Sequence, residues 1–226
     1  LKSEFTQKYD LNSVIVARPE SKMPLWQNEF ILPAEVSSFI NSRKGKFVFY
    51  PAYPRVFKNI EIILEVAALS QQKEIDLNFI ITVDGTENKY SSFLKKKYSK
   101  LSNVLWLGLL PHESIMSIYP KCDLLCFPSK LETWGLPLTE AIHFNIPISC
   151  SDLPYAHETT KGYKRVDFFD PGSPSSVLSS IVKLLYGQQA VDVVDIVDTS
   201  TSNDILEGWS EFSDYIFSKL DGVKNV

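Results

Sequence analysis

The sequence predicts an α/β protein with a Rossmann-like, doubly wound and mostly parallel six-stranded sheet. Between residues 45 and 185, short β-rich runs alternate with amphipathic helical stretches, which is typical of repeated βα units. The β-rich runs are apolar on both faces, as expected for buried parallel strands. The chain has 226 residues, of which 44% are hydrophobic and 22% are charged, so it is long and apolar enough to form a globular core.

The six strands and the helices between them can be assigned in chain order. The expected strands cover residues 46–50, 77–83, 104–107, 123–127, 146–150 and 166–169. Between them, apolar residues recur at the spacing of a helix. The residues with this spacing are Ile62, Ile63, Val66 and Leu69, then, less regularly, Phe93, Lys97 and Tyr98, and finally Val177, Ile181, Leu184 and Leu185.

Three segments are expected along the chain. Residues 46–187 form the Rossmann-like domain, and residues 1–45 form an approach segment with a strand at 14–16 and a short helix at 34–41. Residues 188–226 begin with a polar, acidic linker and end with a helix from about residue 204 to residue 220. The chain begins with Leu1 and has no signal-peptide pattern, so we expect it to be an excised domain.

Charge, hydropathy and cysteine content exclude several classes of protein. The chain has 23 Lys and Arg residues against 27 Asp and Glu residues, a net charge of -4, so no nucleic-acid partner is expected. The longest apolar runs are far shorter than the ~20 residues of a membrane helix. The 3 cysteines form no Cys-x-x-Cys pair and are too few for a disulfide framework, which favours a reducing, cytoplasmic compartment.

Charged and glycine residues follow the first two expected strands. In an open α/β sheet, ligands bind beyond the carboxyl ends of the strands. Arg55 and Lys58 lie in the first of these loops, just ahead of a helix N-terminus, where two cations would suit a diphosphate. Gly85 follows the second strand, where it either lets the backbone approach a ligand or simply adopts a positive φ.

The loop after the fourth strand is the most specific stretch of the chain. A helix is expected to begin near Leu136, because Pro137 suits a first helical turn. The N–H groups of Gly135 and Leu136, together with the helix dipole, form an anion site. Glu132 and Glu140 flank this site, and a carboxylate can accept hydrogen bonds from two adjacent hydroxyls of a sugar or ribose. The plainer interpretation is that both carboxylates only interact favourably with the positive end of the helix dipole. Each such interaction is worth about 0.3–1 kcal/mol.

An ordered series of motifs extends through the expected domain, from about residue 45 to residue 185. Two glutamates are separated by seven residues, with a Trp-Gly-Leu step between them. The motifs are Trp106-Leu107-Gly108, Cys122-Asp123, Phe127-Pro128-Ser129, Glu132 with Trp134-Gly135-Leu136, Glu140-Ala141 and Ile146-Pro147-Ile148. The series resembles the donor-binding, C-terminal half of the GT-B glycosyltransferases, in particular the retaining group 1 type.

The resemblance implies a set of site residues. Lys58, Arg55 and Glu132 are implied as the catalytic set: the two cations neutralise the leaving diphosphate, and the carboxylate contacts the donor sugar. The family usually has a Gly-Arg pair where this chain has Pro51-Ala52, and Arg55 is expected to substitute for that arginine. The residues implied to bind the donor and its nucleotide are Gly85, Gly108, Leu109, Leu110, Ser129, Gly135, Leu136 and Glu140, with Glu140 on the ribose.

The implied reaction is transfer of a glycosyl group from a nucleoside diphosphate sugar to an acceptor, with retention. No metal and no other cofactor is expected, because the chain has no Asp-x-Asp motif. The missing partner is an N-terminal acceptor domain, so the chain alone is expected to bind a donor without transferring from it. Two alternatives stay open: a noncatalytic nucleotide-sugar-binding module, and a domain like the sugar-nucleotide epimerases, for which no acid and base residues are evident.

The remaining histidines and lysines have weaker interpretations. His112, His143 and His157 do not have the spacing of metal ligands, and no role is assigned to them. The lysines at positions 95, 96, 97 and 100 could make a peripheral contact with an anionic membrane at its inner face. A solvated helix face is the simpler account of this run.

Overall fold

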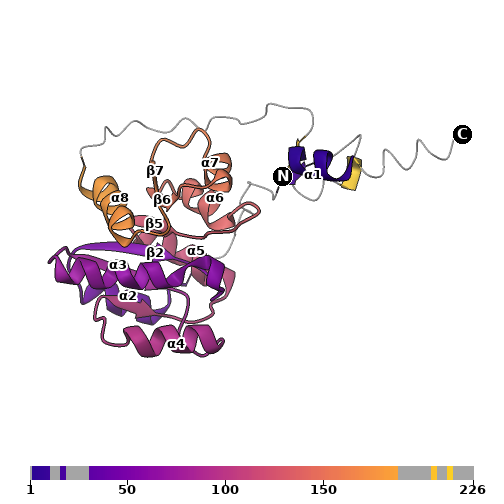
Figure 1. Ribbon diagram of the computed structural model, residues 1–226. Helices are drawn as coiled ribbons and strands as arrows, with labels where there is room; N and C mark the ends of the chain where they lie inside the picture. Colours follow the sequence, from indigo (N-terminus) through magenta and orange to yellow (C-terminus); the bar gives the residue numbers. More distant parts are fainter. Residues whose placement is uncertain (1, 11–15, 19–30, 188–204, 208–212, 216–226) are drawn as a thin grey trace, which may run out of the picture. The chain divides into compact units, whose positions relative to one another are not determined.

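The computed structural model describes residues 2–10, 16–18, 31–187, 205–207 and 213–215 of the chain (Figure 1). The chain divides into two units. The smaller comprises Leu1–Trp26 with Asp195–Val226, and the larger comprises Gln27–Val194. The larger unit holds the predicted α/β sheet and every predicted site residue.

A six-stranded, all-parallel sheet forms the centre of the larger unit, which confirms the predicted Rossmann-like fold. The strands lie in the order β4-β3-β2-β5-β6-β7. Each strand pairs in parallel with its neighbours; Val48 of β2, for example, lies between Phe79 of β3 and Leu124 of β5. The strands are β2 (Lys46–Tyr50), β3 (Leu77–Ile81), β4 (Val104–Trp106), β5 (Leu124–Phe127), β6 (Ile148–Ser151) and β7 (Val166–Phe169).

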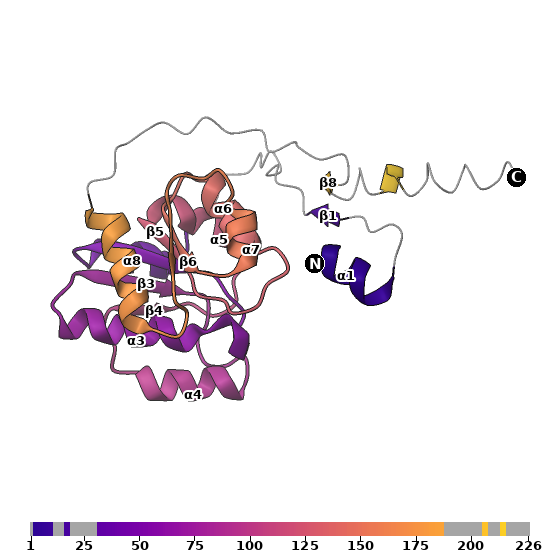
Figure 2. The same ribbon diagram turned by 45° about the horizontal axis from the view of Figure 1, so that its top comes forward.

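Helices cover both faces of this sheet. The chain turns through α3 to reach β3 and through α6 to reach β6, which lie on opposite sides of the β2–β5 pair, so right-handed crossovers place these helices on opposite faces. Helix α8 packs beside α3, and α7 packs beside α6 (Figure 2). The helices are α2 (Ala34–Asn41), α3 (Ile60–Gln72), α4 (Lys89–Tyr98), α5 (His112–Ile118), α6 (Leu136–His143), α7 (Pro154–Thr159) and α8 (Pro174–Tyr186), and the 3-10 turns are η1 (Val56–Lys58) and η2 (Tyr119–Lys121).

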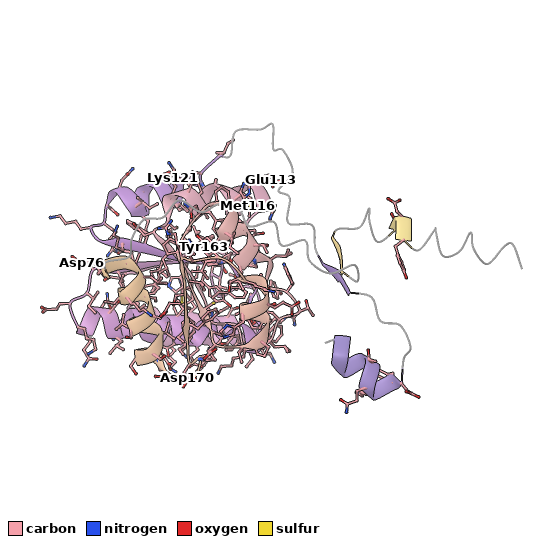
Figure 3. All side chains as sticks on the ribbon, turned by 90° about the horizontal axis from the view of Figure 1, so that it is seen from above. Asp76, Glu113, Met116, Lys121, Tyr163 and Asp170 are labelled. Atoms are coloured by element: carbon pink, nitrogen blue, oxygen red, sulfur yellow. The ribbon has the colours of Figure 1, made fainter. Side chains whose placement is uncertain are left out.

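The core of the larger unit lies between the sheet and these helices. The side chains of Phe49, Phe79 and Phe127, on three neighbouring strands, are fully buried. Figure 3 shows side chains filling the interior, with Asp76 and Asp170 at the periphery. The central strands β3 and β5 are buried on both faces, as their apolar runs predict, whereas the edge strands β4 and β7 are partly buried. Burial of apolar surface is therefore the main force that holds the sheet between its helices.

Local signals explain where several helices begin. Asn88 caps α4: its side chain accepts a 2.9 Å hydrogen bond from the Ser91 N–H, and the Ser91 hydroxyl accepts one from the Asn88 N–H. Ser173 caps α8 by accepting from the Ser176 N–H at 3.3 Å. The weak helical pattern that included Phe93 is only partly confirmed, because α4 forms but Phe93 is exposed, and Leu94 is buried instead.

The smaller unit contains a helix and a two-stranded parallel sheet. Helix α1 covers Lys2–Tyr9, and β1 (Val16–Arg18) pairs with β8 (Ile205–Glu207). The expected helix at residues 204–220 is therefore wrong at 205–207, where parallel pairing with a distant strand determines the structure. Of the strand expected at 14–16, residue 16 begins β1, and residues 14 and 15 lie outside the described residues. The expected polar linker from residue 188 to residue 203 also lies outside them.

Candidate functional site

The candidate site lies where the order of the strands reverses. From β2 the chain proceeds to β3 and β4 in one direction, and from β5 it proceeds to β6 and β7 in the other. The loops that leave β2 and β5 therefore diverge at the carboxyl edge of the sheet, which is the place where open α/β sheets bind ligands. Lys58 lies on the first of these loops, and Glu132 lies on the second.

Hydrogen bonds fix the loop after β2. The buried Tyr50 hydroxyl donates to the Lys58 carbonyl at 2.5 Å, and the Ala52 N–H donates to the Thr82 hydroxyl at 2.8 Å. Asn59 adopts a left-handed conformation with φ of 58°. Its side-chain amide donates to the carbonyl of Pro128 at 3.2 Å and to that of Pro171 at 2.9 Å, which joins the loops after β2, β5 and β7.

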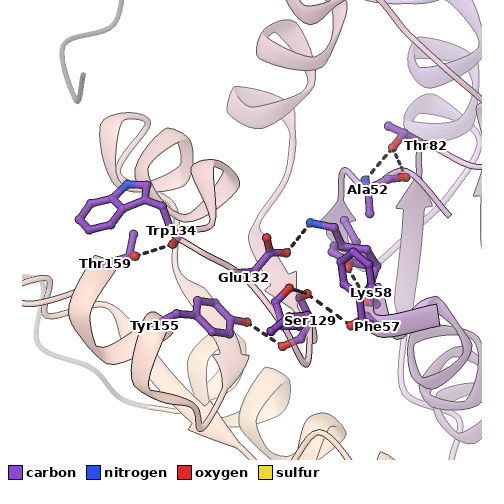
Figure 4. Close-up of polar contacts among 11 residues, drawn as sticks. Ala52, Phe57, Lys58, Thr82, Ser129, Glu132, Trp134, Tyr155 and Thr159 are labelled. Atoms are coloured by element: carbon purple, nitrogen blue, oxygen red, sulfur yellow. Dashed lines mark hydrogen bonds and ion pairs between the residues drawn. The ribbon is translucent and has the colours of Figure 1, made fainter. Parts of the chain in front are cut away.

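Lys58 and Glu132 form an ion pair across the two loops (Figure 4). Only 21% of the Lys58 side chain and 12% of the Glu132 side chain are exposed. The Lys58 ammonium also lies 5.6 Å from the ring centroid of Phe57 and 5.9 Å from that of Phe127. The structure thus brings together two of the three predicted catalytic residues and places a cation and a carboxylate at the strand-order reversal.

Arg55, the third predicted catalytic residue, lies on the same loop but is exposed. Its guanidinium group lies 5.2 Å from the ring centroid of Tyr53. Its N–H donates to the Tyr53 carbonyl at 2.9 Å, and its carbonyl accepts from the Lys58 N–H at 2.9 Å. Arg55 is therefore a neighbour of Lys58 along the loop, while Lys58 is the residue that contacts Glu132.

The loop after β5 is held by the loop after β2, by α7 and by its own Ser129 side chain. The Lys130 N–H donates to the Phe57 carbonyl at 2.7 Å, and the Tyr155 hydroxyl donates to the Ser129 carbonyl at 2.8 Å. The hydroxyl of the buried Ser129 donates to the Leu131 carbonyl at 3.2 Å. Ser129 thus holds the turn that presents Glu132, and its predicted contact with the donor stays a prediction.

Helix α6 begins at Leu136, as predicted, and Gly135 precedes it with φ of 85°. A Cβ at Gly135 would lie 3.2 Å from Leu138 Cδ1 and 3.3 Å from Phe127 Cε1, so both the conformation and the packing favour glycine. Within the described part of the chain, no hydrogen bond uses the N–H of Gly135 or Leu136. Their predicted role, with the helix dipole, as an anion site stays a prediction.

Glu140 is one turn further along α6, and both of its carboxylate oxygens are contacted. The Tyr119 hydroxyl donates to Oε2 at 2.7 Å, and Nε2 of His112 lies 3.2 Å from Oε1. The Glu140 side chain is 15% exposed. Sequence reasoning missed both partners, because Tyr119 has the pattern of a core aromatic residue and His112 belongs to no recognisable motif.

The loops after β3 and β4 hold the remaining predicted residues. Gly85 and Gly108 have φ of 99° and 73°. A Cβ at Gly85 would lie 2.7 Å from Lys95 Cβ, and one at Gly108 would lie 2.7 Å from Asp84 Oδ2. Both glycines are thus explained by close packing, and their contacts with a nucleotide stay predictions. Leu109 is exposed and Leu110 is half-buried on the segment that leads into α5.

The lysines of α4 make contacts within the domain. The Lys95 ammonium lies 4.4 Å from the ring centroid of Trp106, and Lys97 forms a 2.6 Å ion pair with Glu61. Lys96 and Lys100 are exposed. The peripheral membrane contact stays a prediction. None of the described helices is both long and apolar enough to cross a membrane.

The other polar residues do not form a metal centre. Among the described residues, no group of three or more His, Cys, Asp or Glu side chains could hold a metal ion. His157 lies 2.6 Å from Asp152 and stacks on Phe168, with 3.9 Å between ring centroids. The three cysteines are free thiols, and burial raises the pKa of each above its usual range.

The strand order of this parallel sheet defines a doubly wound, Rossmann-like α/β domain. A helix N-terminus, a lysine and two carboxylates lie near its switch point. A comparison with family models makes the assignment specific. The model described as "Glycosyl transferases group 1" matches residues 34–192, and the chain belongs to this family.

Two curated relatives are also similar to this chain. One is the "UDP-N-acetylglucosamine--peptide N-acetylglucosaminyltransferase GtfA subunit" of Streptococcus parasanguinis, 28% identical over 159 residues, which are 70% of this chain and 29% of the relative. The other is the "Uncharacterized glycosyltransferase YqgM" of Bacillus subtilis (strain 168), 26% identical over 85 residues, which are 38% of this chain and 24% of the relative. The chain therefore spans less than a third of the length of either relative in these matches.

Proposed function

We propose that this chain binds the nucleoside diphosphate sugar of a glycosyltransferase that moves the glycosyl group to an acceptor with retention. The Lys58–Glu132 ion pair beside the start of α6 carries the proposal. The lysine and the backbone N–H groups of Gly135 and Leu136 are suited to a diphosphate. The carboxylate of Glu132 is suited to the hydroxyls of a sugar.

Most of the predicted residues have a role in this proposal. Lys58, with Arg55 beside it, neutralises the charge that develops on the departing diphosphate, and stabilising such charge often contributes more to catalysis than any other effect. Glu132 accepts hydrogen bonds from the donor sugar, and Glu140 accepts them from the ribose. The loop of Gly108, Leu109 and Leu110 lines the pocket of the base. The proposal includes no divalent metal, because the lysine, the arginine and the helix N-terminus supply positive charge.

The test is isothermal titration of the chain with UDP-, GDP- and ADP-sugars, with and without EDTA. UDP-N-acetylglucosamine is the first donor to try, because one relative is named for its use of that compound. We expect at least one donor to bind, with the same affinity in EDTA. Failure of every donor to bind would contradict the proposal, and a large loss of affinity in EDTA would contradict its metal-free form.

We further propose that this chain alone binds a donor without transferring from it. The match to less than a third of each relative supports a location of the acceptor site outside this chain. Positioning of the acceptor can supply roughly 7–11 kcal/mol of barrier reduction, which a donor domain alone lacks. The chain is incubated with donors and with saccharide, lipid and peptide acceptors while nucleotide release is followed. Turnover near ~1 s⁻¹, an ordinary enzyme rate, would contradict this proposal.

One feature favours a second candidate, a noncatalytic nucleotide-sugar-binding module. Pro51 and Ala52 directly follow β2, where the family usually has glycine and arginine, and the Ala52 backbone is hydrogen-bonded to the Thr82 hydroxyl. Analysis of products formed by a longer protein that contains this chain separates the candidates. Donor binding with no glycosylated product would favour the module.

A further inference from the structure

Tyr119 contacts the side chain of Glu140, a predicted ligand-binding residue, and is itself firmly held. It begins η2, and its side chain is fully buried. Its ring stacks on Phe144, with 5.4 Å between centroids and 10° between planes, and meets the ring of Phe49 edge-on at 5.1 Å. Phe144 directly follows α6 and Phe49 lies in β2, so the position of the Tyr119 hydroxyl is set by both the sheet and the helix.

That hydroxyl is aimed at Glu140. It donates to Oε2 at 2.7 Å and also lies 3.5 Å from the Pro137 carbonyl in the first turn of α6. Burial and the nearby charge of Glu140 raise the pKa of Tyr119 well above its usual range, so the phenol remains protonated and can donate. A hydrogen bond from a buried donor to a carboxylate is stronger and more directional than a neutral one.

The second contact of Glu140 is of a different kind. His112 is 49% exposed, and its Nε2 lies 3.2 Å from Oε1. It begins α5, directly after the loop of Gly108, Leu109 and Leu110. The half-exposed imidazole is more easily displaced than the phenol, which is enclosed by two rings. A hydroxyl that approached from solvent would therefore replace His112 and leave Tyr119 in place.

We propose that Tyr119 is a positioning residue that fixes the carboxylate of Glu140 to accept the ribose hydroxyls of a nucleoside diphosphate, and so makes the site selective for ribonucleotides over deoxyribonucleotides. This inference rests on the proposed function, because it requires a nucleotide at the switch point. A carboxylate oxygen has two lone pairs, so Oε2 can hold the tyrosine hydrogen bond and still accept from a ribose hydroxyl. Oε1 accepts the other hydroxyl once His112 has moved.

The test compares the affinities of ribo- and 2′-deoxyribonucleoside diphosphates for the wild-type chain and for Tyr119→Phe. The probes are UDP, GDP and ADP with their 2′-deoxy counterparts, measured by isothermal titration. We expect the wild-type chain to prefer the ribonucleotide, and Tyr119→Phe to bind it ~5–10-fold more weakly while binding the deoxy form within about twofold of the wild type. The preference for ribose therefore falls in the variant.

Tyr163→Phe is the matched control. Tyr163 is also buried, and its hydroxyl donates to the Ile146 carbonyl at 2.8 Å, away from Glu140. We expect this variant to keep the wild-type preference for ribose. Glu140→Gln supplies a second measurement that does not depend on the folding of Tyr119→Phe. This variant should lose most of the preference for ribonucleotides over deoxyribonucleotides.

The outcomes separate this inference from the proposed function. The inference would be overturned if Tyr119→Phe lost the same affinity for the ribonucleotide and the deoxyribonucleotide, or if Glu140→Gln kept the full preference for the ribonucleotide. Nucleotide binding itself would stand in both cases. Failure of all six diphosphates to bind the wild-type chain would overturn the proposed function, and the inference with it.

Discussion

Glu132 and Glu140 are separated by only seven residues in the sequence, but the structure holds them in opposite ways. Glu132, in the loop after β5, is paired with the cation Lys58. Glu140, inside α6, is held by the buried hydroxyl of Tyr119 and approached by His112. A cation can be drawn away by a phosphate, whereas a buried neutral donor cannot. We therefore expect the first carboxylate to change partners when a ligand binds and the second to keep its orientation.

Removal of Lys58 should have the largest effect on binding. A charge-assisted contact with phosphate is worth about 1–3 kcal/mol, so Lys58→Ala should weaken nucleoside diphosphate binding by roughly 5- to 150-fold. Isothermal titration measures the change, and Lys96→Ala, on an exposed part of α4, is the control. If both variants bind as the wild type does, Lys58 does not contact the phosphates.

Loss of the Glu140 charge should have a smaller effect. Glu140→Gln keeps the shape of the side chain but weakens its hydrogen bonds to ribose, so we expect ~10-fold weaker nucleotide binding. The melting temperature should fall by only a few degrees, because the side chain lies at the edge of the core. Titration and thermal unfolding are measured together. A variant that unfolds at the wild-type temperature and binds with unchanged affinity would remove Glu140 from the site.

Much of this arrangement could be predicted from the sequence. The apolar runs predicted the six strands, and Pro137 predicted the start of α6 near Leu136. The ion pair could not be predicted, because it depends on β2 and β5 being neighbours in the sheet, which is a long-range property. The same is true of β8, whose partner β1 is remote in sequence.

The environment of Glu140 shows a second limit on what can be predicted from the sequence. The sequence predicted the carboxylate, but a buried tyrosine in a helical stretch has the pattern of a core residue whether or not its hydroxyl is used. Gly85 and Gly108 show the converse, since their positive φ values and close neighbours explain them without a ligand.

Asp84 extends the comparison to a carboxylate held mainly by local neutral donors, with a smaller contribution from the charge of Lys95. Its substitution should have the smallest effect. Hydrogen bonds from the Thr86 hydroxyl at 2.7 Å and the Thr86 N–H at 2.8 Å hold the pKa of Asp84 below its usual value. Because the folded pKa lies below the unfolded one, the stabilisation is present above about pH 4 and is lost as the pH falls through the folded pKa.

The corresponding variant is Asp84→Asn, followed by thermal unfolding at a series of pH values. We expect it to be less stable than the wild type by no more than about 0.5 kcal/mol near pH 7. The difference should shrink between about pH 5 and pH 2. A difference that grew on acidification would contradict the assigned direction.

The central claim is that the Lys58–Glu132 pair opens to admit a diphosphate and a sugar. The most direct test measures the affinity of Glu132→Gln for a nucleoside diphosphate and for the corresponding nucleoside diphosphate sugar. Without the competing carboxylate, Lys58 should bind the bare diphosphate more tightly than in the wild type. The nucleoside diphosphate sugar should lose the affinity that its sugar adds, because a neutral amide is a weaker acceptor for the hydroxyls than the Glu132 carboxylate. Weaker binding of the bare diphosphate, or an unchanged ratio of the two affinities, would contradict the account.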